Sequence, residues 1–92
     1  NAVGSKHRLG VLLELVKVGK NGLTIGEIQE CLDIPASTLA HHLDFLKDAD
    51  LIYQERKGRS IFNYAKFDYI ELLGNYLLKK CCVEQGKIKR KI

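Results

Sequence analysis

The sequence predicts a small, mainly α-helical domain that carries one β-hairpin. Apolar residues recur with a helical period in separate stretches, and two β-rich stretches bracket a short basic segment. No internal repeat or long linker divides the 92 residues. A single domain of this length buries only about 60–65% of the surface that its unfolded chain would expose. We therefore expect a thin core, to which a second copy of the chain would add buried surface.

The composition excludes several classes of protein. Apolar residues make up 46% of the chain and charged residues 28%, which is ordinary for a folded globular domain. No apolar run approaches the roughly 20 residues that span a bilayer, and the N-terminus lacks the pattern of a signal peptide. We expect a cytoplasmic protein without membrane contact. The net charge of +4 is compatible with a nucleic-acid partner.

The first helix is predicted from apolar spacing. Leu9, Leu12, Leu13 and Val16 lie at positions i, i+3, i+4 and i+7, which places them on one stripe of a helix. Gly19 and the turn at residues 20–22 should end this helix.

Two further helices follow with a tight turn between them. Thr24 stands three residues before Glu27, the spacing of a capping box. Pro35 disfavours helical backbone at the residue before it and suits a new helix start, so the turn lies at residues 33–35. The inward apolar positions are Ile25, Ile28 and Leu32 in the second helix, and Leu39, Leu43 and Leu46 in the third. A helix, a tight turn and a second helix with a polar outer face form a helix-turn-helix.

A hairpin is predicted next, because the period of the sequence changes. Residues 51–55 and 60–65 are rich in Ile, Tyr and Phe, and bracket a basic tip with a Lys57-Gly58 turn between Arg56 and Arg59. A basic hairpin after a helix-turn-helix predicts a winged helix-turn-helix.

The last helix is predicted to begin with Asp68 as its N-cap and to end at Gly86. Its apolar stripe needs a partner and consists of Tyr69, Leu72, Leu73, Tyr76 and Leu77. We assign residues 3–86 to the winged helix-turn-helix domain and residues 87–92 to a basic C-terminal tail.

The polar residues of the third helix predict contact with double-stranded DNA. Ser37, Thr38, Ala40 and His41 have short side chains or groups that can donate to or accept from base edges and phosphates. The three cations of the wing, Arg56, Lys57 and Arg59, are long enough to reach phosphates. The alternative for both sets is an ordinary solvated surface. His42, nearer the leucine stripe, is expected to pack at its edge.

The cysteines indicate reduced thiols rather than a disulfide framework, because Cys81 and Cys82 are adjacent and Cys31 is distant. Two adjacent thiolates can bind a soft ion such as arsenite or another thiophilic metal. Alternatively, these cysteines are small apolar residues at the end of a helix stripe. Cys31 is expected in the core. The sequence has no Gly-rich phosphate loop, no His-x-x-x-His or paired Cys-x-x-Cys motif, and no carboxylate pair beside a candidate base. We therefore expect no enzyme and no required cofactor.

The chain resembles the ArsR/SmtB family of repressors from Arg8 to Cys82. The most specific stretch is residues 32–43 (LDIPASTLAHHL), followed by Leu46, residues 49–52 (ADLI) and the wing at residues 56–64 (RKGRSIFNY). The resemblance implies a homodimer formed by the first and last helices. It also implies a palindromic operator, from which an inducer releases the protein. The family's contact positions correspond to Ser37, Thr38, Ala40 and His41, with Arg56 and Arg59 on the wing.

The resemblance bears on the inducer as well. Residues 24–27 (TIGE) stand where some members have a Cys-x-Cys pair, and no His beyond His42 offers the family's zinc site on the last helix. Cys81 and Cys82 resemble an adjacent pair that binds arsenite in other members, without the usual third sulfur. Two alternatives remain open. One is a thiol-redox or sulfide-responsive repressor in which Cys31 bonds to the pair. The other is a winged-helix interaction module without DNA binding.

Overall fold

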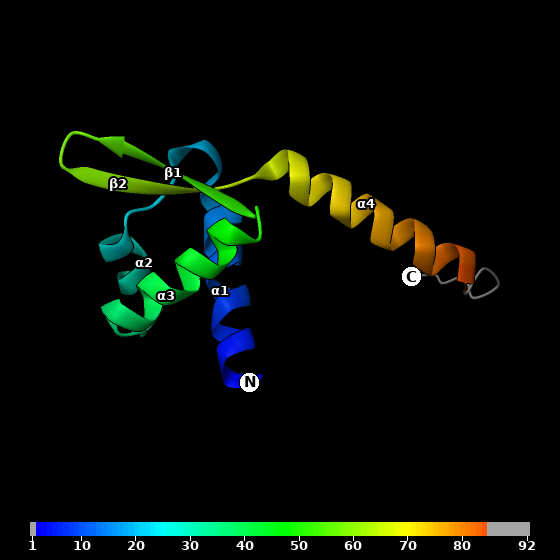
Figure 1. Ribbon diagram of the computed structural model, residues 1–92, viewed down its shortest axis with the longest axis horizontal. Helices are drawn as coiled ribbons and strands as arrows, with labels where there is room; N and C mark the ends of the chain where they lie inside the picture. The colour runs from blue at the N-terminus through cyan, green and yellow to red at the C-terminus, as the bar shows by residue number, and fades with distance from the viewer. Residues whose placement is uncertain (1, 85–92) are drawn as a thin grey trace.

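The computed structural model describes residues 2–84 and confirms the predicted mainly α fold with one hairpin (Figure 1). Its elements, in chain order, are α1 (Ala2–Val18), the 3-10 helix η1 (Gly19–Asn21), α2 (Ile25–Cys31), α3 (Ala36–Asp48), β1 (Ile52–Lys57), β2 (Ser60–Ala65) and α4 (Phe67–Glu84). Helices α1, α2 and α3 form the body, and the hairpin extends from one end of it.

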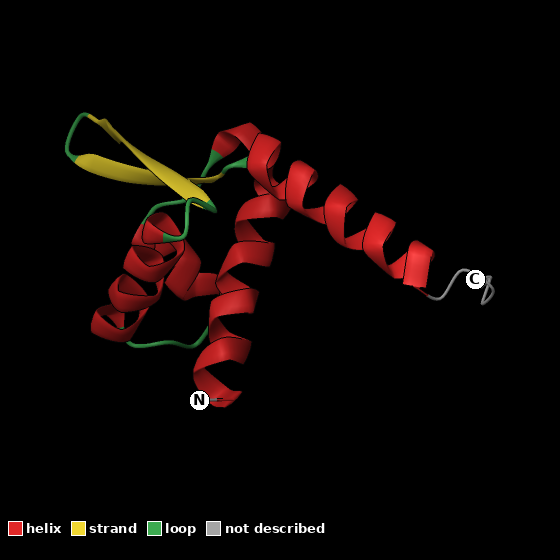
Figure 2. Cartoon of the chain, turned by 45° about the vertical axis from the view of Figure 1, so that its right-hand side comes forward, coloured by secondary structure: helices red, strands yellow, loops and turns green. Residues whose placement is uncertain are grey.

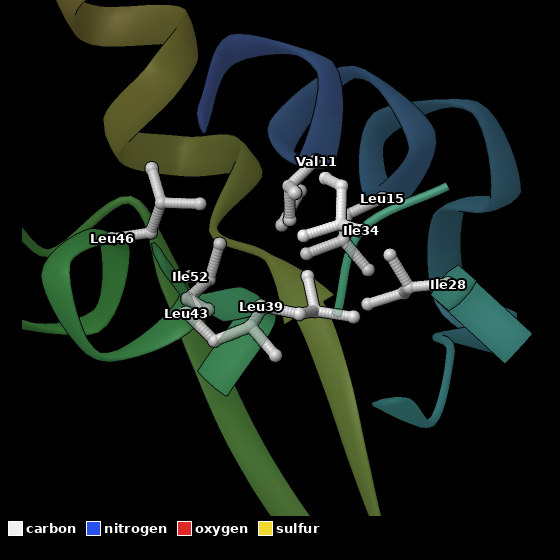
Figure 3. Close-up of a cluster of buried hydrophobic side chains, with 9 residues drawn as sticks. Val11, Leu15, Ile28, Ile34, Leu39, Leu43, Leu46 and Ile52 are labelled. Atoms are coloured by element: carbon white, nitrogen blue, oxygen red, sulfur yellow. The ribbon is translucent and has the colours of Figure 1, made fainter. Parts of the chain in front are cut away.

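The core lies where the three body helices meet the inner ends of the strands (Figure 3). Each of its aliphatic side chains contributes about 1.5–3 kcal/mol by leaving water, which fixes α3 against α1. The buried aliphatic residues are Val11, Leu15, Ile28, Ile34, Leu39, Leu43, Leu46 and Ile52. Only part of the predicted apolar stripe of α1 contacts this core. Leu12 and Val16 pack against it, whereas Leu9 and Leu13 are 57% and 51% exposed.

The start of α2 and the turn between α2 and α3 are built as predicted. The Thr24 hydroxyl accepts from the Glu27 backbone N–H at 3.2 Å, and the Glu27 carboxylate accepts from the Thr24 N–H at 2.9 Å. Pro35 immediately precedes α3 with φ of −58°, and its carbonyl accepts from Leu39 N–H at 2.9 Å. The capping box therefore sets where α2 begins, and Pro35 sets where α3 begins.

The hairpin turn differs by one residue from the prediction. Lys57 pairs with Ser60, so the two-residue turn is Gly58-Arg59 and β1 extends two residues beyond Glu55. Gly58 has φ of +64°, and a glycine with positive φ at the first central position is typical of a type II′ turn. This turn suits the twist of the strands, which explains the shift in register.

The inner end of the hairpin is held by one buried amide. Asn63 is 1% exposed, and its Nδ2 donates to the Leu23 carbonyl at 3.0 Å while its Oδ1 accepts from Gln54 Nε2 at 2.7 Å. Leu23 and Asn63 also exchange two backbone hydrogen bonds. The segment before α2 is thereby tied to the wing.

Helix α4 projects from the body, as both views in Figures 1 and 2 show. It begins at Phe67, so Asp68 lies in its first turn rather than at the predicted N-cap. The predicted helix end at Gly86, the boundary there and the tail at residues 87–92 lie outside the described residues. In the part of the chain that the structure describes, no helix is long and apolar enough to cross a membrane.

Candidate nucleic-acid interface

The first turns of α3 present a polar surface to solvent. Ser37, Thr38 and His41 are exposed and Ala40 is half-buried. The opposite side of the helix carries Leu39, which is fully buried. Because that side is anchored in the core, the polar residues are held on a rigid element with a fixed orientation. Four predicted contact residues are therefore brought together on one surface.

The wing carries the predicted cations, but not all on one side. Arg56, Lys57 and Arg59 are exposed. Arg56 pairs with Ile61 and Lys57 pairs with Ser60, and successive strand residues point to opposite faces of the sheet. Arg56 and Lys57 therefore face opposite sides of the wing, with Arg59 at its tip.

Lys57 lies over aromatic rings of the wing. Its ammonium is 5.3 Å from the ring centres of Phe62 and Tyr64. The phenol of Tyr64 raises the pKa of Lys57 above its ordinary value. The ammonium of Lys57 is therefore placed beside these two rings.

An arginine of α1, which the sequence patterns did not single out, joins that helix to α3. Arg8 Nε donates to Nδ1 of His42 at 3.3 Å, and its guanidinium lies 3.8 Å from the centre of the Phe45 ring. His42 is 4% exposed and packs as predicted. Burial lowers the pKa of His42, and the charges of Arg8, His41 and His7 lower it further. The neutral imidazole is the form that accepts from Arg8.

The cysteines are placed differently from the prediction for Cys31. Cys31 is exposed rather than in the core, because α2 ends at that residue and the chain then turns away. Cys81 is exposed near the far end of α4, at the opposite end of the molecule from α2 (Figures 1 and 2). The side chain of Cys82 lies outside the described part. Among the side chains that the structure describes, no group of three or more His, Cys, Asp or Glu is placed to hold a metal ion.

Known proteins with similar sequences include transcriptional repressors. A family profile described as a helix-turn-helix domain matches residues 3–55. The chain is 30% identical over 86 residues to the arsenical resistance operon repressor of Bacillus subtilis (strain 168), a match that covers 94% of this chain and 78% of that protein. It is 39% identical over 51 residues to the transcriptional repressor SdpR of the same strain, which covers 55% of this chain and 54% of that repressor.

A solved structure supports the fold. The ArsR-like transcriptional regulator from Rhodococcus sp. RHA1 superposes with a TM-score of 0.67 at 17% identity, over 94% of this chain and 88% of that one. At this identity the likeness concerns the fold alone.

A helix-turn-helix with a rigid polar surface and a basic hairpin defines the winged-helix class of DNA-binding proteins. Within that class, the chain belongs to the ArsR family of transcriptional repressors. It is thus a DNA-binding transcriptional regulator, and the family is one of regulators, not of enzymes.

Proposed function

We propose that this protein is a repressor that binds a palindromic operator as a homodimer. In this proposal α3 enters the major groove, where Ser37, Thr38, Ala40 and His41 contact bases and phosphates, and the wing holds the phosphates alongside. The observation that carries the proposal is the exposed polar surface at the start of α3, opposite a helix face that is anchored in the core.

The proposed homodimer uses α1 and α4. Most of the exposed large apolar side chains among the described residues lie on these two helices, and exposing so many is costly for a lone chain. On α1 and α4 they are Leu9, Leu13, Phe67, Tyr69, Leu72, Leu73, Tyr76, Leu77 and Leu78. A dimer of this kind would place two copies of α3 about 34 Å apart, one helical turn of DNA.

A mobility-shift titration on the DNA upstream of the gene tests DNA binding. The Arg56→Ala/Arg59→Ala variant is expected to bind all duplexes more weakly. The slope of log affinity against log salt is expected to be smaller by about 4, because each subunit of the dimer loses two phosphate contacts. Lys79→Ala/Lys80→Ala removes the same charge from the far end of α4 and is expected to keep the slope. An unchanged slope in the arginine variant would contradict the wing assignment.

We further propose that a soft metal ion such as arsenite is the inducer and binds at Cys81 and Cys82. Support comes from the relative that is an arsenical resistance operon repressor and from the exposure of Cys81, since thiophilic ions prefer sulfur ligands. Cys31 ends α2, at the opposite end of the molecule from the far end of α4, so a third sulfur would come from the partner copy or from a small thiol.

Arsenite titrated into the protein–operator complex tests the inducer. Release is expected for the wild type and for Cys31→Ser, and is expected to be lost in Cys81→Ser/Cys82→Ser. Identical release in all three proteins would contradict the site. Release by an oxidant, with a disulfide between copies detected by mass spectrometry, would favour the redox alternative instead.

A further inference from the structure

One carboxylate lies on the proposed reading surface of α3. Asp44 is exposed and stands three residues after His41 and seven after Ser37, which places all three on one face of the helix. The opposite face is buried through Leu39, Leu43 and Leu46. When Ser37 and His41 face a major groove, Asp44 faces it too.

Asp44 forms no salt bridge with any described residue. The ion pairs among the described residues are Lys17 with Glu14 and Lys66 with Asp50, and neither involves α3. An unpaired carboxylate facing phosphates would weaken binding by repulsion. The floor of the major groove offers a different environment, because base edges there present amino donors.

The amino donors in that groove are N4 of cytosine and N6 of adenine. A carboxylate carries only acceptors when ionised, so it matches a single amino group. Adenine presents the acceptor N7 beside its amino group, which a carboxylate cannot satisfy, whereas the cytosine amino group stands without such an acceptor on the same base. Cytosine is therefore the better partner for Asp44.

We propose that Asp44 is a specificity-determining residue that accepts a hydrogen bond from N4 of a cytosine in each operator half-site. The proposal rests on the proposed function, since it needs α3 in the major groove. It adds one selected base pair to contacts that otherwise come from hydroxyl and imidazole groups.

Selection of binding sites from a randomised duplex pool tests this role, with Asp44→Ala, Asp44→Asn and Asp48→Asn compared with the wild type. The wild type is expected to enrich one cytosine per half-site. In Asp44→Ala that preference is expected to fall about tenfold to a hundredfold at this position alone. Asp44→Asn is expected to turn the preference toward adenine, because a carboxamide matches adenine N6 and N7.

Asp48→Asn is the charge-matched control. Asp48 is exposed and lies on the same face as Asp44, but one turn further on, at the C-terminal end of α3 and away from the N-terminal turns that contact base edges. Its substitution removes the same charge and is expected to keep the cytosine preference. If Asp44→Ala binds every sequence more tightly by the same factor and keeps the cytosine preference, the proposal is overturned. Asp44 would then act only by repelling the phosphates. Loss of an adenine preference in Asp44→Ala would overturn the cytosine assignment. A wild type that enriches no sequence would instead overturn the proposed function, and this inference with it.

Discussion

Gly22 occupies a position in the turn before α2 that other residues do not fit. Its φ of 65° and ψ of 173° suit glycine, and an added Cβ would lie 2.6 Å from a carbon of the Tyr64 ring. That ring cannot yield easily, because it stacks on Tyr53 at a centre distance of 5.0 Å. The inner end of the wing therefore depends on the absence of a side chain at Gly22.

Gly22→Ala is expected to lower the free energy of unfolding by about 2–4 kcal/mol, from backbone strain together with overpacking. Gly19→Ala is the matched control. Gly19 has φ of 60° but no atom within 4 Å of an added Cβ, so about 1 kcal/mol is expected from the backbone alone. Urea unfolding measures both values, and equal losses would contradict the role of the Tyr64 ring.

His42 makes stability depend on pH. Its pKa lies below the ordinary value of 6.5, through burial first and the charges of Arg8, His41 and His7 second. The unfolded chain therefore binds the proton more readily than the folded one. The contribution of neutral His42 is complete above pH 6.5 and is lost as the pH falls from 6.5 through the lowered folded-state pKa.

His42→Asn is expected to reduce this loss of stability, because an amide oxygen can still accept from Arg8 without titrating. Urea unfolding measured from pH 8 to pH 5 gives the slope for each protein. His41→Asn, at the exposed neighbour, is the control and is expected to keep most of the wild-type slope. A His42→Asn protein with the wild-type slope would show that the acid loss arises elsewhere.

Among the elements, α2 depends on its cap. The helix has seven residues, too few to be stable by its own hydrogen bonds, and Ile28 is its one buried residue. Thr24→Ala removes the hydroxyl that accepts from the Glu27 N–H and is expected to cost about 1 kcal/mol. Thr24→Ser keeps the hydroxyl and is expected to retain most of the stability. Equal stability of the two variants in urea unfolding would show that the capping bond contributes nothing.

The elements that sequence reasoning placed well are those with local causes. The capping box of Thr24 and Glu27 and the break at Pro35 each act within a few residues, so the pattern alone locates them. The exposed face of α3 is also predicted from a local pattern, because the spacing of its leucines shows which side is buried and therefore which side is exposed.

The features that sequence reasoning missed or misplaced depend mainly on contacts between residues far apart in the sequence. The Arg8–His42 hydrogen bond joins residues 34 apart, and no local period signals it. Apolar residues lie on two faces of α1, and the packing of α1 against α2, α3 and β2 decides that Val11 and Leu15 are buried while Leu9 is exposed. Cys31 fits an apolar stripe, but the helix ends there.

The whole molecule is elongated, with extents of 52 × 26 × 22 Å, because α4 stands away from the body. Leu72, Leu77 and Leu78 are each more than half exposed. A surface of this kind is typical of a contact between subunits.

Leu77→Asp is therefore expected to convert a dimer into a monomer in sedimentation experiments. The helical circular-dichroism signal is expected to stay unchanged, because Leu77 is 57% exposed and adds little to the core of its own chain. Affinity for a palindromic duplex is expected to fall about a hundredfold or more, since two linked half-site contacts become one. Asn75→Asp adds the same charge about 200° around the helix, and is expected to remain dimeric. A dimeric Leu77→Asp protein with wild-type affinity would mean that α4 does not form the subunit contact, and the apolar side chains of α1 would then have to form it without α4.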